Sequence, residues 1–156
     1  MHSDLGRLYA HLEWADQAML AALDEARGPN ETAHKLLAHI IAAERIWLDR
    51  IQSRPAGPTA AWADLTLPEC RAQSAQIMTG YRALIESTPE DHLDDLVSYR
   101  NLQGMAFQTP LRDILLHVAL HGAYHRGQIA AALRHSGFNP PGTDFILFSR
   151  QTGSKP

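Results

Sequence analysis

Three histidines stand at positions from which they could bind one metal ion. His121 and His125 are four residues apart in LHVALHGAYHRGQ, so on a helix they lie one turn apart on the same inward face. Two imidazoles at this spacing can ligate a single ion, as in the helical zinc motif of metalloproteases. His39 lies on the apolar stripe of an earlier helix, between Leu36 and Ala43, and would supply a third nitrogen.

Three protein ligands leave coordination positions open for water or substrate, which is the arrangement of catalytic rather than structural sites. The competing interpretation is that these histidines are packed side chains bonded to backbone carbonyls or carboxylates. Burying three imidazoles costs desolvation that ordinary packing does not repay. The spacing alone leaves both interpretations open.

Other polar residues are predicted near this centre. Asp16 lies within the apolar stripe of the first helix, and a buried carboxylate is rare unless it is paired. It would either orient a metal-bound histidine or pair with an arginine or with backbone N–H groups. His117 lies one turn before the histidine pair, at the edge of the same face. Gln128, three residues after the pair, would orient substrate or water, or would simply pack. Arg126 projects away from the centre, which favours a structural salt bridge.

Four long stretches with apolar residues at helical spacing must position these side chains. They run over about 3–27, 31–54, 66–87 and 109–136. Capping signals mark their ends: Asn30 before the second helix, a Thr66/Glu69 capping box before the third, Gly28–Pro29 after the first and Gly137 after the last. The stretch 55–65 is a linker rich in proline and alanine.

The order of these stretches predicts an all-α four-helix bundle, with a long crossover loop or a short hairpin over 96–109, between the third and fourth helices. Residues 1–150 are expected to form one domain, and residues 151–156 a frayed tail. The apolar segment 138–148 is expected to fold back on the bundle. A second stripe on the first helix, around Trp14, would either form a dimer face or be covered by that segment.

Composition excludes several classes of protein. The 14 Lys plus Arg and 17 Asp plus Glu give a formal charge of −3, which lacks the basic face of a nucleic-acid-binding protein. The chain contains no apolar run of the roughly 20 residues that a membrane span requires, and its first residues carry charge where a signal peptide would be apolar. Cys70 is the only cysteine, so no internal disulfide can form and a cytoplasmic location is expected.

Four motifs resemble those of the DinB/YfiT-like family of four-helix-bundle metalloenzymes, in the same order along the chain. They are WAD in the first helix, LLAHIIAAERIWLDRI in the second, HGAYHRGQIAAALR in the fourth, and PPGTDF after it. Together they extend from about residue 8 to residue 148. The resemblance implies a divalent metal, nickel or zinc, held by His39, His121 and His125, and a homodimer.

The better-understood members of that family are thiol-dependent S-transferases and isomerases. The resemblance therefore implies that the metal activates a low-molecular-weight thiol, such as bacillithiol, mycothiol or glutathione, for attack on a small electrophile. The reacting group would be a metal-bound thiolate or water, and Cys70 is not expected to be the nucleophile. The first alternative is a metal-dependent hydrolase. The second is a non-catalytic stress-response or binding protein that the metal stabilises.

Overall fold

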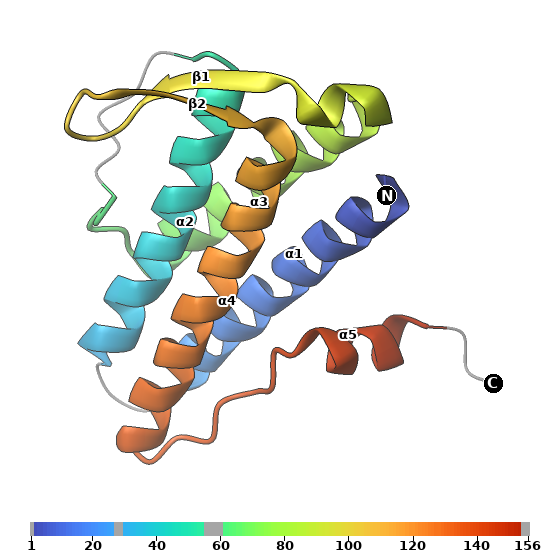
Figure 1. The fold of residues 1–156 in the computed structure, drawn as a ribbon. Coiled ribbons are helices and arrows are strands. Elements are labelled where there is room, and N and C mark those ends of the chain that lie inside the picture. The colour runs from blue at the N-terminus through green and yellow to red at the C-terminus, as the bar shows by residue number, and fades with distance from the viewer. Residues whose placement is uncertain (1, 27–29, 55–60, 154–156) are drawn as a thin grey trace.

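The structure, a computed structural model, describes residues 2–26, 30–54 and 61–153 (Figure 1). Four long helices form a bundle: α1 (His2–Glu25), α2 (Glu31–Ile51), α3 (Leu67–Ser87) and α4 (Leu111–His135). Each of α1 and α2 packs against both α3 and α4, so α1 and α2 lie diagonally across the bundle. The predicted all-α four-helix bundle is confirmed.

The ends of two helices differ from the prediction. The second was expected to reach Arg54, but α2 ends at Ile51, and Ser53 adopts a left-handed conformation with φ of 52°. The first was expected to reach residue 27, but α1 ends at Glu25. The predicted stop at Gly28–Pro29 and the first part of the linker, residues 55–60, lie outside the described residues.

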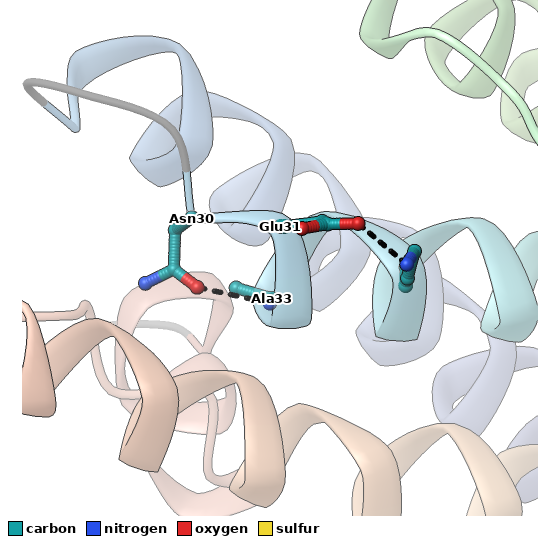
Figure 2. A network of polar contacts seen from close by, with 4 residues as sticks. Asn30, Glu31 and Ala33 are labelled. Carbon is teal, nitrogen blue, oxygen red and sulfur yellow. Dashed lines mark hydrogen bonds and ion pairs between the residues drawn. The ribbon is translucent and has the colours of Figure 1, made fainter.

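Asn30 caps α2 and also ties it to α4. Its Oδ1 accepts a hydrogen bond from the backbone N–H of Ala33 at 3.0 Å, as Figure 2 shows. Its Nδ2 donates to the carbonyl oxygen of Ala132 at 3.1 Å and to Ser136 Oγ at 3.0 Å. A capping side chain normally satisfies only the helix that it begins. Here the same amide fixes the start of α2 beside the end of α4, the two helices that carry the predicted metal ligands.

The crossover between α3 and α4 is a short β-hairpin, which decides between the two predicted forms. After a 3₁₀ turn, η1 (Glu90–Asp94), strand β1 (Leu96–Arg100) pairs antiparallel with β2 (Ala106–Pro110). Asn101 Oδ1 accepts the N–H groups of Gln103 and Met105 in the turn, and Gly104 supplies the positive φ of 83° that the turn needs. The hairpin crosses the C-terminal end of α2 (Figure 1).

The C-terminal segment folds back on α1, as predicted, and carries a fifth helix, α5 (Phe145–Thr152). The ring of Phe148 lies 5.8 Å from that of Trp14, so the tail covers the second stripe of α1 at this point. The tail was expected to fray over residues 151–156; Gln151 and Thr152 are helical, and residues 154–156 lie outside the described residues. The Thr152 hydroxyl donates to the carbonyl oxygen of Phe148 at 2.9 Å, within the last turn of this helix.

The apolar core fills the space between the four helices. The predicted stripe of α1 is buried, with Leu12 and Met19 completely inaccessible. Trp47 of α2 is half-buried and packs against this core. Among the described residues, no helix is both long enough and apolar enough to cross a membrane.

Candidate metal centre

His39, His121 and His125 converge between two neighbouring helices. His39 lies on α2 and the other two on α4, and these helices run side by side (Figure 1). One nitrogen from each ring lies within 4.8 Å of the other two. The ring centroids are 4.5 to 5.1 Å apart. The two histidines that lie four residues apart on α4 thus face His39 on α2, as the sequence predicts.

Hydrogen bonds fix which nitrogen two of these rings present. His39 Nδ1 lies 2.6 Å from the carbonyl oxygen of Ala61, which can only accept, so Nδ1 carries the proton. His125 Nδ1 lies 2.8 Å from Gln128 Oε1 and donates in the same way. Each ring therefore keeps the lone pair of Nε2 free. Metal-binding histidines commonly donate their other N–H to such an acceptor, which orients the ring and strengthens the ligand.

The surroundings favour the neutral, metal-binding form of the rings. Burial lowers the pKa of His121 to about 4, with further lowering by the neighbouring His125 and His39. Burial also lowers the pKa of His39, against the opposing effect of its bond to Ala61. A protonated imidazole cannot ligate a metal. At neutral pH these two lone pairs are available without the loss of a proton.

Trp62 covers one face of the His39 ring. Its ring stacks on His39 with a centroid distance of 4.0 Å and an angle of 14° between the planes. Because Trp62 follows Ala61 directly, one short segment both orients His39 and shields one face of its ring. His39 is consequently only 8% exposed, although it lies near the surface of the bundle.

The donor set fits a borderline divalent ion such as zinc or nickel, because neutral imidazole nitrogens suit both. Nitrogens at about 2.1 Å from one tetrahedral ion lie about 3.4 Å from each other. The rings would therefore move inward from their separations of up to 4.8 Å, which small side-chain rotations can achieve. The three histidines could hold a metal ion with open coordination positions.

Asp16 pairs with an arginine, which is one of the two roles predicted for it. Its Oδ1 lies 2.8 Å from Arg126 Nη1, and the two side chains are 0% and 2% exposed. Arg126 thus forms the salt bridge that its projection favoured. Gly122, one turn earlier, makes room for it, because a Cβ at that position would lie 2.8 Å from Nη1. Asp16 thus joins α1 to α4 through Arg126, and no described hydrogen bond joins it to a histidine.

Glu44 of α2 completes this buried charge cluster and was missed in the sequence. It is 1% exposed, and burial followed by the negative charge of Asp16 raises its pKa well above the usual range. This shift favours the protonated, uncharged form of Glu44 beside the Asp16–Arg126 pair. Asp16 Oδ2 and both Glu44 oxygens have no hydrogen-bond partner among the described residues, so a second negative charge here would be poorly compensated.

The remaining predicted site residues separate into two cases. Gln128 lies at the centre, where it orients His125. His117 is exposed and stays outside the group of three, with its ring 5.6 Å from that of His121 and 5.2 Å from that of Trp47. The contributions of Ala61 and Trp62 carried no signal in the sequence, because a backbone carbonyl has no residue type and the segment has no periodicity.

The chain matches known proteins over nearly its whole length. A family model described as the DinB family matches residues 1–155 of the chain. The chain is also similar to Protein DinB of Bacillus subtilis (strain 168), with 24% identity over 159 residues. That alignment covers 91% of each of the two chains. The family match spans both α2 and α4, and with them all three histidines.

Proposed function

The chain belongs to the DinB family, and from that premise we propose that it is a metal-dependent enzyme that transfers a low-molecular-weight thiol to a small electrophile. The observation that carries the proposal is the convergence of His39, His121 and His125. Nδ1 of His39 and of His125 is already bonded, which leaves Nε2 of each ring for a metal. A nickel or zinc ion bound there would lower the pKa of a thiol and hold it as the thiolate.

The chain's own residues support this chemistry in two ways. Ala61 and Gln128 each accept a hydrogen bond from one ligand ring and so fix its tautomer. Both rings therefore always present Nε2 to the metal. A cavity of about 290 Å³ adjoins the centre and is lined by His39, His121 and Trp47 among others. Its size suits a small molecule rather than a macromolecule. The proposal also includes a homodimer and a cytoplasmic location, which remain predictions.

The hydrolase alternative finds no carboxylate base among the described residues of the cavity beside the centre. Among the described residues that line the cavity beside the centre, none is an aspartate or a glutamate. Asp16, the buried carboxylate of α1, is paired with Arg126 and does not line this cavity. A hydrolase would need another group to take the proton from the attacking water.

The first experiment is metal analysis of the protein made without a histidine tag. We expect about one equivalent of a transition metal in the wild type, its loss in His121→Ala, and its retention in the control His135→Ala. His135 is exposed at the end of the same helix and outside the group of three. Absence of metal from the wild type after reconstitution with zinc and with nickel would contradict the proposal.

The second experiment separates the candidate functions. Metal-loaded protein is assayed with a panel of electrophiles in the presence and absence of each thiol. A transferase requires the thiol, whereas a hydrolase is unaffected or inhibited by it. A non-catalytic protein shows no turnover and loses much of its stability when the metal is chelated.

A further inference from the structure

A second cavity of about 440 Å³ lies next to the one at the metal centre, under the β-hairpin. The two cavities share Ile46, Arg50, Asn101 and Leu102 as lining residues. They are therefore adjacent parts of one depression between the end of α2 and the hairpin. One molecule can reach from the second cavity to the histidines.

Arg50 stands at the junction and is held in a fixed orientation. Its guanidinium carbon lies 4.5 Å from the ring centroid of Trp47 and 5.1 Å from that of Tyr99. Cation–π contacts of this kind hold the planar group by its faces and leave its N–H donors unused. Among the described residues, Arg50 has neither an ion pair nor a hydrogen bond from its side chain. A half-buried guanidinium with free donors suits an incoming anion.

The rest of the second cavity is also positive. Arg54 and Arg100 line it together with Arg50, against one acidic residue, Asp49. Asp49 lies 3.7 Å from Arg54, so its charge is partly offset. Arg100 donates to the carbonyl oxygen of Gly104 at 2.7 Å and keeps its full charge. Three guanidinium groups and one carboxylate give this wall a net positive charge.

We propose that this depression binds the carboxylate of a small molecule at Arg50, and so places the reacting group of that molecule at the three histidines. The inference rests on the proposed function, and names the chemical class of its substrate: a carboxylate-bearing thiol or a carboxylate-bearing acceptor. Arginine binds carboxylates through two parallel hydrogen bonds, which fix orientation as well as position. Arg50 is a specificity-determining residue in this scheme.

The test is calorimetric titration of zinc-loaded protein with three probes. Glutathione carries a thiol and two carboxylates, its diethyl ester keeps the thiol but has no free carboxylate, and maleate carries two carboxylates and no thiol. We compare the wild type with Arg50→Gln, which removes the charge, and with Arg45→Gln as the matched control. Arg45 lies on the same helix, donates to Gln76 at 3.3 Å and lines neither cavity.

We expect at least one carboxylate probe to bind about tenfold or more weaker to Arg50→Gln than to the wild type, and equally to Arg45→Gln. The diethyl ester should bind weakly and without dependence on Arg50. If the substitution weakens the binding of glutathione alone, the bound carboxylate belongs to the thiol substrate. If it weakens the binding of maleate, the bound carboxylate belongs to the acceptor. Equal binding of every probe to the wild type and Arg50→Gln, or no binding of any probe, overturns the inference.

Two controls separate failure of this inference from failure of the proposed function. Thermal melting and metal content of Arg50→Gln should match the wild type, which excludes misfolding. Maleate titration is repeated on metal-free protein, because carboxylate binding at Arg50 needs no metal. Arg50-dependent maleate binding without metal uptake would sustain the anion site and refute the metalloenzyme. If the protein takes up metal and transfers a thiol, and Arg50→Gln changes neither binding nor transfer, the metalloenzyme is sustained and the anion site is refuted.

Discussion

The bond between Gln128 and His125 offers a sharp test of the metal centre, because it can be removed without touching a ligand. Gln128→Leu keeps a side chain of similar size and deletes the acceptor that lies 2.8 Å from His125 Nδ1. The ring then loses the partner that fixes its tautomer and its rotation. We expect weaker metal binding with an unchanged fold, since Gln128 is only half-buried.

The size of the effect follows from the contact. A hydrogen bond to a group that gains positive charge on metal binding contributes about 1.5–3 kcal/mol. Loss of an acceptor behind a metal-bound histidine typically costs 10- to 100-fold in affinity, or about 1.4–2.7 kcal/mol. The two ranges agree. We therefore expect the dissociation constant for zinc to rise about 10- to 100-fold in Gln128→Leu.

The assay is competition for zinc with a chromophoric chelator at pH 7. Gln128→Glu retains an acceptor and should bind zinc at least as tightly as the wild type. Gln76→Leu is the control, because Gln76 is an exposed helical glutamine that bonds only to Arg45 among the described residues. Its affinity for zinc should stay within about twofold of the wild type.

Two results would refute the reasoning. One is that Gln128→Leu binds zinc as tightly as the wild type, which would mean that the tautomer of His125 does not limit the affinity. The other is that Gln128→Glu loses as much affinity as Gln128→Leu. In that case the shape of the amide, rather than its acceptor oxygen, would be what matters.

Three further predictions concern stability and reactivity. Arg126→Leu leaves Asp16 buried without its partner and should lower the free energy of unfolding, measured in urea, by about 3–5 kcal/mol. The exposed control Arg134→Leu should change this free energy by less than about 0.5 kcal/mol. Equal effects of the two substitutions would contradict a stabilising role of the buried pair. In metal-free protein the folded-state pKa of His121 is about 4, below its ordinary 6.5, so the unfolded chain binds this proton more readily. The stability that this residue contributes is complete above pH 6.5 and is lost as the pH falls toward 4. Urea titrations between these pH values should show a smaller loss in the free energy of unfolding for His121→Ala than for the wild type. Equal losses in the two proteins would refute the lowered pKa of His121. Cys70 is buried and burial raises the pKa of its thiol to about 11, so an aromatic disulfide reagent should label it only as fast as the protein unfolds; rapid labelling of folded protein would show an accessible thiolate.

The local features of this protein were determined by its sequence. Helical periodicity and capping residues act over a few positions, so the four helices, the capping box at Thr66 and the end at Gly137 could be predicted without tertiary information. The pairing of His121 with His125 follows from the helical repeat in the same way. The inward placement of His39 needed only the stripe of α2. These features depend on one helix at a time.

Contacts between distant segments could not be read in this way. Asp16 and Arg126 are 110 residues apart, and the sequence left open whether the carboxylate would meet an arginine or a histidine. Glu44 gave no signal, because a glutamate in a helix is ordinarily solvated and only the packing of α1 and α4 against α2 buries it. The same holds for the tautomer of His39, which a backbone carbonyl 22 residues away selects.

The arrangement around Arg50 also belongs to the tertiary structure. Trp47 is on the same helix, but Tyr99 arrives on the hairpin, and only the packing of β1 over α2 brings both rings to the guanidinium. The sequence thus determined which residues could bind a metal, since that depends on residue type and helical spacing. The tertiary structure decided which nitrogens are free, which charges are buried and which cation faces the centre, because each of these depends on groups that meet only when the chain folds.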